Sequence, residues 1–477
     1  MNIRRHLLPY LMLVLTVAGC ADQTARFTRD KRAADLESAS PDAANNLTTA
    51  LLQHFGTPNR LVSWAALPID FGSIDGTVLA ANGADVLRVS LETEPPAGMA
   101  NVAAVFGDQN PSSRLVVSYD ASSRLLTLAP GSDTTTAPAP GTRIRLVGHQ
   151  LQYGRQLFMH HCMHCHGVAG DGYGPTARYI RNHKFNPMPR DFRRGTFKFT
   201  STKDGIYARR DDLRRTVRFG LSGTYMPSFR LLTESELDAV IEYVRFLSMR
   251  GETERRLLAH FQPLIDAQTA QERQSLEQEL NGEGFTEAFN DAASLIAENW
   301  QTAEESGNTV LPTVARVPDT IESRKKGRDL FISTKINCAK CHGPLGRGNG
   351  SFLGEIQKNL DTNEKYSEPG LFDNWHNRIF PRDLTSAIYR GGRRPLDLFR
   401  RITTGVKGTP MPGFAALAEK DRWHIVNYVL SIPIAGAFPQ EHDHADGDDH
   451  DHKVDKPAAA AAAVKGSGSS SKDKKQP

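Results

Sequence analysis

The chain of 477 residues has little net charge and few cysteines. Its formal net charge at pH 7 is only +4. So small an excess gives no strong general attraction to nucleic acid or to an anionic membrane surface, and we expect no nucleic-acid partner. Only five cysteines are present, so each of them needs its own explanation.

A hydrophobic run long enough to cross a bilayer is missing from the N-terminus. The apolar run from Leu7 to Val17 falls short of the roughly 20 residues that a span needs. It follows two arginines and precedes small residues, which is typical of an export signal over residues 1–19. The run ends in the letters VAGC, which resemble a bacterial lipobox. We therefore expect Cys20 to be lipidated, and the protein to face the periplasm from the inner or outer membrane of the cell envelope. Ordinary signal cleavage is the alternative, but Cys20 is the one cysteine left over from two pairs.

The rest of the chain changes composition along its length. Residues 20–60 are polar and are expected to form a flexible tether. Residues 61–148 alternate short β-rich runs with turns, which predicts a small sandwich or barrel that acts as a spacer, or else as a docking platform. Residues 251–319 are charged and mostly helical, and are expected to be a linker. Residues 436–477 are rich in His, Asp and Ala, and are expected to be a disordered tail.

The two remaining segments, residues 151–250 and 320–435, repeat one another. Each begins with a Gly-Arg-x-Leu-Phe run, followed by Cys-x-x-Cys-His and a glycine-rich loop. Each continues with Pro-Arg-Asp, then Met-Pro, and closes with an apolar pattern at helical spacing. The sequence therefore predicts two copies of one all-α domain.

The pattern Cys-x-x-Cys-His has a direct chemical reading. Residues at i and i+3 share one face of a short helix, so both sulfurs can reach the two vinyl groups of one porphyrin. The histidine that follows then aims a nitrogen at the iron, and the pattern is interpreted as c-type haem attachment. We expect two covalently bound haem c groups, held by Cys162, Cys165 and His166 in one copy and by Cys338, Cys341 and His342 in the other.

Three other uses of a Cys-x-x-Cys pair fit less well. A disulfide would not require the histidine, and would not recur with the same flanking residues. A zinc site needs about four ligands, and each copy offers two cysteines and one histidine together. Thioredoxin-like redox chemistry expects the pair in a βαβ context, which is missing here.

Both copies resemble class I cytochrome c domains, in the subgroup with Pro-Arg-Asp before the distal-methionine loop. The resemblance implies that Gly154 and Phe158, and likewise Gly327 and Phe331, lie on an N-terminal helix. That helix would cross the final helix near Tyr243 and Tyr428, respectively. It also implies that the haem iron takes a methionine sulfur opposite each histidine. These axial ligands would be His166 with Met226, and His342 with Met411.

Other side chains compete for roles around the haem. His183 and His376 precede the Pro-Arg-Asp steps and are the alternative distal ligands. Met188 begins a second Met-Pro step, but copy two has Phe380 there. Arginines near the expected haem propionates are hypothesised to pair with them: Arg190, Arg382, Arg214, Arg215, Arg400 and Arg401.

Closed axial sites favour one-electron transfer over catalysis. By analogy with lipid-anchored dihaem cytochromes, we expect the chain to carry electrons from a quinol-oxidising complex to a terminal oxidase or a soluble cytochrome. The main alternative is an enzyme, either a dihaem peroxidase or a haem-containing dehydrogenase subunit, which would need an open iron site. A third possibility is a structural or sensory lipoprotein.

Overall fold

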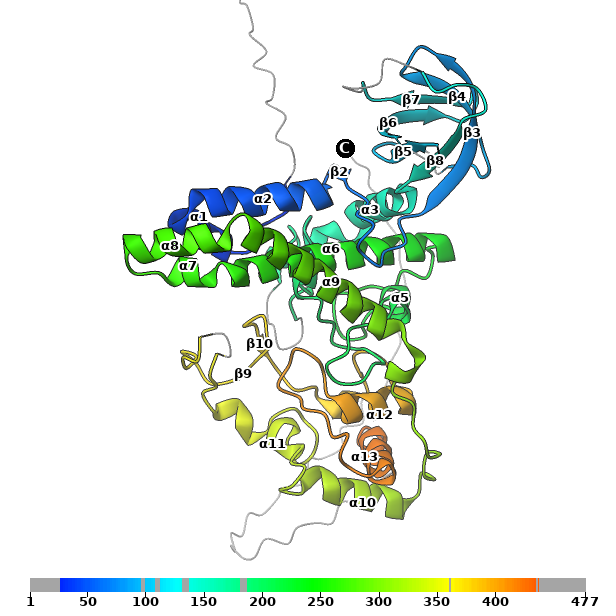
Figure 1. The fold of residues 1–477 in the computed structure, drawn as a ribbon. Helices are drawn as coiled ribbons and strands as arrows, with labels where there is room; N and C mark the ends of the chain where they lie inside the picture. The colour runs from blue at the N-terminus through cyan, green and yellow to red at the C-terminus, as the bar shows by residue number, and fades with distance from the viewer. Residues whose placement is uncertain are drawn as a thin grey trace, which may run out of the picture. The chain divides into compact units, whose positions relative to one another are not determined.

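The structure is a computed structural model that describes residues 26–434 and residue 436, apart from 96–98, 108–111, 131–136, 181–186 and 360–361. Figure 1 shows the arrangement of the helices and strands. The export signal, Cys20 and the His/Asp-rich tail lie outside the described residues. In the described part of the chain, no helix combines the length and the hydropathy that crossing a membrane requires.

The β-rich segment folds as a closed antiparallel barrel, which confirms the predicted β-domain and selects barrel over sandwich. Alternating buried and exposed positions along its strands give the barrel a core of its own, built around Val78, Leu87 and Leu126. The strands close in the order β3-β4-β7-β6-β5-β8. Their bounds are β3 Ser73–Asn82, β4 Val86–Leu91, β5 Ala103–Phe106, β6 Ser112–Asp120, β7 Leu125–Leu128 and β8 Arg143–Val147.

The prediction of a flexible tether over residues 20–60 is wrong for its described part. Residues 32–55 form α1 (Arg32–Ala39) and α2 (Pro41–Phe55), followed by a short hairpin of β1 (Gly56–Thr57) and β2 (Arg60–Leu61). The Ser40 side chain caps α2 by accepting a hydrogen bond from the backbone N–H of Ala43. Both helices bury an apolar stripe in the core of the first cytochrome-like copy. Polar residues on the opposite faces lower the average hydropathy, so composition alone concealed the amphipathic pattern.

The first copy is built on two crossing helices, α3 (His149–His161) and α6 (Glu234–His260), with α4 (Met163–His166) and α5 (Arg210–Phe219) beside them. Gly154 lies at the crossing, where a Cβ atom would come within 1.9 Å of the carbonyl oxygen of Ala239. The rings of Phe158 and Tyr243 meet there, with centroids 5.2 Å apart. The expected helix crossing near Tyr243 is therefore confirmed.

The segment 251–319 does not separate the two copies in the way that the sequence suggested. Helix α6 continues without a break to His260, and α7 (Gln262–Asp266) and α8 (Ala270–Leu280) lead into α9 (Glu283–Glu304). Helix α9 packs back on α6 and buries Trp300, whose Nε1 donates to Glu252 at 2.9 Å. This segment is largely helical, as predicted, but its helices are part of the core of the first copy. Its last residues, including Val310, Val314 and Val317, pack in the core of the second copy.

The second copy repeats the crossing with α10 (Ile321–Ile332) and α13 (Glu419–Ser431). A Cβ atom on Gly327 would lie 2.0 Å from the carbonyl oxygen of His424, and the rings of Phe331 and Tyr428 are 5.4 Å apart. The copy also contains α11 (Ala339–His342), α12 (Pro395–Thr404) and a hairpin of β9 (Leu371–Phe372) and β10 (Arg378–Ile379). Its buried residues form a separate core.

Candidate haem-binding sites

Each Cys-x-x-Cys-His run forms a single helical turn. The backbone N–H of His166 donates to the carbonyl of Cys162 at 2.9 Å, and that of His342 donates to Cys338 at 2.9 Å. These are the i to i−4 bonds of an α-helix, so both cysteines and the histidine of each copy are held in one turn. A glycine with φ of +74° ends each turn and starts the glycine-rich loop.

The histidine rings are fixed by a matched pair of hydrogen bonds. His166 Nδ1 lies 3.1 Å from the carbonyl oxygen of Arg190, and His342 Nδ1 lies 3.1 Å from that of Arg382. A carbonyl only accepts, so Nδ1 carries the proton and donates in both copies. The Nε2 lone pair is then left for a metal, which is the arrangement that orients metal-binding histidines in proteins.

The surroundings of both histidines keep the imidazoles neutral. Burial lowers the pKa of His166 to about 4, and it lowers the pKa of His342 below its ordinary value. The ring of Phe192 also stacks on His166, with centroids 4.6 Å apart. A neutral imidazole is the form that binds iron, so the two side chains fit an axial role.

The cysteines of the two pairs form no disulfide with one another, and their environment does not suit redox or zinc chemistry. Burial raises the pKa of Cys162 to about 12 and that of Cys338 to about 11. Reactive thiols have lowered pKa values. No cluster of three or more His, Cys, Asp or Glu side chains with the geometry of a metal site occurs among the described residues. These thiols, beside a histidine with a free Nε2, fit covalent haem attachment.

Met226 and Met411 end two loops of the same shape. Their carbonyls accept from the backbone N–H of Leu221 at 3.1 Å and of Val406 at 3.2 Å, respectively. Their own N–H groups donate to the hydroxyl oxygen of the threonine two residues earlier, at 3.1 and 3.3 Å. The two methionines thus occupy equivalent, half-buried positions, and their coordination to iron stays a prediction.

Comparison with known proteins agrees with this geometry. The family model of cytochrome c matches residues 151–248 and 325–433. The chain contains two cytochrome c domains. Such domains bind haem c covalently and transfer electrons.

Other comparisons add little to this assignment. No curated protein matches the chain. Among solved structures, a chain titled as part of the Kuenenia stuttgartiensis reducing HAO-like protein complex is 24% identical, with a TM-score of 0.41. The match covers 59% of this chain and 96% of that one. A superposition this loose carries no argument about function.

The alternative distal histidines and the arginines predicted near the haem propionates lie in different surroundings. His183 lies outside the described residues, whereas His376 takes a positive φ of 63° and its Nδ1 lies 3.0 Å from the Tyr366 hydroxyl. The Arg190 guanidinium lies over the Trp375 ring, 3.6 Å from its centroid. The remaining arginines bond to protein atoms: Arg214 to Asp238, Arg215 to Asp397, Arg382 to Ile388, Arg400 to Val310 and Arg401 to Gly392. Pairing of these arginines with haem propionates stays a hypothesis.

Sequence reasoning missed the contacts between the two cytochrome c domains. Domain 1 is the first copy, which matches the family over residues 151–248, and domain 2 is the second copy, which matches over residues 325–433. The methionine loop of domain 1 meets domain 2 at Gly223, whose carbonyl accepts from Arg390 at 3.4 Å and whose Cα faces Arg382 and Ile388. Near the methionine loop of domain 2, Lys407 donates to the Thr202 hydroxyl of domain 1 at 2.6 Å. No sequence signal marks these contacts, since the two hydrogen bonds join residues that are 167 and 205 positions apart.

Proposed function

We propose that this protein is a lipid-anchored dihaem cytochrome c that carries single electrons in the cell envelope. Its partners would be a quinol-oxidising complex as donor and a terminal oxidase or soluble cytochrome as acceptor. The observation that carries the proposal is the duplicated site, in which each histidine is fixed by a backbone carbonyl and each copy has an equivalent methionine loop.

The residues of each copy would have separate roles in binding haem. The cysteine pairs would bind the porphyrin covalently, His166 and His342 would bind its iron, and Met226 and Met411 would close the opposite side. When bound, haem c supplies an iron that alternates between the ferric and ferrous states. With both axial positions filled by protein, no position is left for a substrate, so the chain would exchange electrons alone.

Contacts between the domains support electron exchange within one chain. Gly223, in the methionine loop of domain 1, lies against Arg382, the residue whose carbonyl holds His342. The methionine loop of domain 1 is therefore adjacent to the residue of domain 2 that orients His342. The Arg215–Asp397 ion pair, at 2.6 Å and with the Asp397 side chain buried, connects the same two domains.

Haem content and ligation test the proposal directly. Purified full-length protein should contain two covalent haems, show the weak far-red band of His/Met iron when oxidised, and bind no carbon monoxide when reduced. Met226→Ala and Met411→Ala should each open one iron to carbon monoxide. Met188→Ala is the matched control, because Met188 also precedes proline but has no counterpart in domain 2. Carbon monoxide binding by the unmodified protein would contradict the carrier function and favour a peroxidase or dehydrogenase subunit.

Membrane attachment needs a separate test. Cys20→Ala should abolish labelling by radioactive palmitate and release the protein from washed membranes, if Cys20 is the lipidated residue. Labelling that survives the substitution would show that the anchor is elsewhere.

A further inference from the structure

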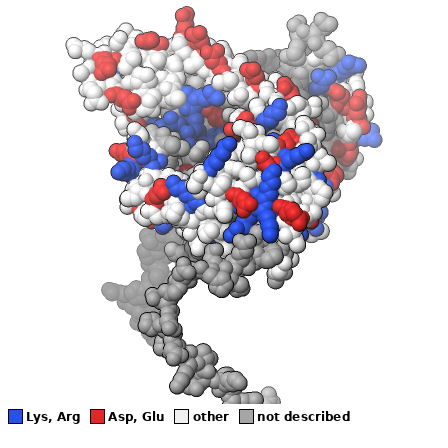
Figure 2. All heavy atoms as spheres, turned by 90° about the horizontal axis from the view of Figure 1, so that it is seen from below, with Lys and Arg blue, Asp and Glu red and all other residues white. Residues whose placement is uncertain are grey.

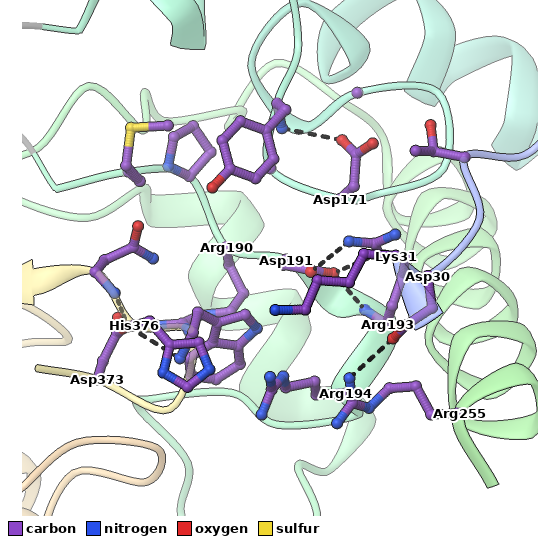
Figure 3. Close-up of a pocket in the computed structure, with 18 of the residues that line it drawn as sticks. Asp30, Lys31, Asp171, Arg190, Asp191, Arg193, Arg194, Arg255, Asp373 and His376 are labelled. Atoms are coloured by element: carbon purple, nitrogen blue, oxygen red, sulfur yellow. Dashed lines mark hydrogen bonds and ion pairs between the residues drawn. The ribbon is translucent and has the colours of Figure 1, made fainter. Parts of the chain in front are cut away.

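A cavity of about 1340 Å³ lies beside the candidate haem site of domain 1. It adjoins the segment 189–194, which we call the strap because its Arg190 carbonyl accepts the hydrogen bond of His166. The equivalent strap of domain 2 begins at Pro381 and holds His342 through Arg382. Figure 3 shows that its walls come from segments far apart in the sequence. The lining includes Asp30 and Lys31 from the N-terminal segment, Arg190, Asp191, Arg193 and Arg194 from the strap, Arg255 from α6, and Asp373 and His376 from domain 2. The two cysteines, His166 and Met226 do not line it, so the cavity is separate from the haem-binding residues.

Positive charge is concentrated in this cavity. Eleven lysine and arginine side chains line it, against five aspartates and no glutamate. Three of those aspartates already bind cations: Asp30 binds Arg255 at 3.1 Å, Asp191 binds Arg193 at 2.8 Å, and Asp373 binds Lys198 at 3.1 Å. Figure 2 shows both signs interspersed over most of one face of the molecule, with Lys and Arg gathered in one hollow of it. Two lining arginines pair with glutamates outside the cavity, Arg29 with Glu37 at 3.5 Å and Arg378 with Glu368 at 2.9 Å. The lining itself still has more cations than carboxylates.

A buried hydrogen-bond donor also lines the cavity. The indole Nε1 of Trp375, a lining residue, is buried and has no partner within the described residues. A buried donor without a partner is rare in folded proteins, because it forfeits its bond to water. The guanidinium of Arg190 lies on the same indole ring, 3.6 Å from its centroid.

Lys198, one of the lining cations, lies in a partly buried position. Burial and, to a smaller extent, the neighbouring Arg190 lower the pKa of Lys198 to about 8, although Asp373 raises it. An anion in the cavity would stabilise the charged form of Lys198.

We propose that this cavity binds a small soluble anion carrying two or more negative charges, of the phosphate or pyrophosphate class. Arg190, Lys198 and the indole N–H of Trp375 would contact its oxygens. Phosphoryl oxygens suit the site because they accept several hydrogen bonds at once and pair well with guanidinium groups. The excess of positive charge favours a doubly charged anion over a single carboxylate.

The test is calorimetric titration of the purified, haem-loaded full chain with inorganic pyrophosphate, at an ionic strength held constant with sodium chloride. We expect saturable binding to one site. Trp375→Phe keeps a ring for Arg190 to stack on and removes only the N–H donor, and it should weaken binding about fivefold. Arg190→Gln should weaken it about tenfold or more while leaving the backbone carbonyl that holds His166.

Arg88→Gln, an exposed arginine on strand β4 of the barrel, is the matched control and should bind as the unmodified protein does. Haem absorbance and circular dichroism check that each variant is folded, and Trp375→Phe carries the test alone if Arg190→Gln misfolds. Absence of saturable binding would overturn the proposal, as would equal binding by all four proteins. It would also fall if propionates of the bound haem already occupied these cations, since pyrophosphate would then not bind.

Binding should also affect redox behaviour, and this part rests on the proposed function. Negative charge next to Arg190 would favour ferric over ferrous iron at the domain 1 site and lower its midpoint potential. Saturating pyrophosphate should shift that one potential and leave that of domain 2 unchanged. Equal shifts at both sites, or none, would refute this coupling, while the calorimetric result would still decide whether the anion site exists.

Discussion

Cytochrome c domains 1 and 2 share the shape of their haem sites and differ in what covers them. The helical turn of the cysteines, the histidine–carbonyl bond and the methionine loop agree in their hydrogen bonds to within a few tenths of an ångström. The final helix, however, has 27 residues in domain 1 and 13 in domain 2. Helices α1, α2 and α9 pack on the longer helix, α6, and the shorter helix, α13, has no such layer among the described residues.

The longer helix also buries charge, which its counterpart does to a much smaller extent. Glu242 and Arg245 form a buried ion pair at 2.7 Å, and Arg250 and Glu254 form another at 2.9 Å. Such pairs require a covering layer that completes their hydrogen bonds, and here the N-terminal segment does so: the backbone N–H of Asp30 donates to Glu254. The two copies therefore share the geometry of the site and differ in the layer of helices that covers it.

Removing one pair of cysteines should give the largest effect and should show how far the two domains depend on each other. Cys162→Ala with Cys165→Ala, or Cys338→Ala with Cys341→Ala, should each lower the haem content from two per chain to one. We expect the domain 1 variant to be the less stable, because its core also includes α1, α2 and α9. Haem staining after denaturing electrophoresis and intact mass measure the outcome. Loss of both haems in either variant would show that the domains do not fold separately.

The helix crossings should be equally sensitive in the two domains. Gly154→Ala and Gly327→Ala each place a Cβ atom about as close to a backbone carbonyl, at 1.9 and 2.0 Å. The helices would have to separate, and we expect the free energy of unfolding to fall by about 3 kcal/mol in each case. Denaturant titration measures this, with Gly307→Ala as control, because no atom lies within 4 Å of its added Cβ. A loss confined to one domain would show that the crossings are not equivalent.

A buried carboxyl should give domain 1 a pH-dependent stability. Burial raises the pKa of Glu252 to about 7, although Tyr207 and Trp300 donate hydrogen bonds to it. Between the unfolded pKa near 4.5 and the folded value, the folded state binds a proton that the unfolded state has lost. Stability should therefore decrease as pH rises from 4.5 to about 7, by about 3 kcal/mol.

Glu252→Gln removes that proton equilibrium and should flatten this part of the profile. Thermal melting followed at pH 5 and pH 8 compares the two proteins, with Glu298→Gln on the exposed face of α9 as control. If the unmodified protein melts at the same temperature at both values, Glu252 does not bind the additional proton. A decrease that persists in Glu252→Gln would assign the pH dependence to another group.

Substitution of Arg190 or Arg382, the arginines of the two straps, should have the smallest effect, a change in midpoint potential. Arg190 is buried against Trp375, whereas the hydrogen bonds of the Arg382 guanidinium are exposed to solvent. Arg190→Gln should lower the midpoint potential of the domain 1 site by tens of millivolts, and Arg382→Gln should change that of domain 2 less. Potentiometric titration with optical detection resolves the two. Equal shifts would mean that the two straps are electrostatically equivalent.

Local patterns explain why much of this protein could be predicted. The Cys-x-x-Cys-His turn, the glycines at the crossings and the alternating strands of the barrel each depend on residues that are neighbours in sequence, or on a repeat that shows them twice. The predictions failed where a segment was judged by average polarity: residues 32–55 are helical because an apolar stripe finds a core to pack on, and residues 283–304 join that core for the same reason.

By itself the sequence determined the prediction of how haem is attached, because two sulfurs and an imidazole spaced on one helical turn leave little choice of chemistry. Only the tertiary structure decided what surrounds each site. The stacking of Arg190 on Trp375, the burial of Glu252 and the cationic cavity all join residues far apart in the chain. Charge and burial depend on distances in three dimensions, and no spacing along the sequence fixes those distances.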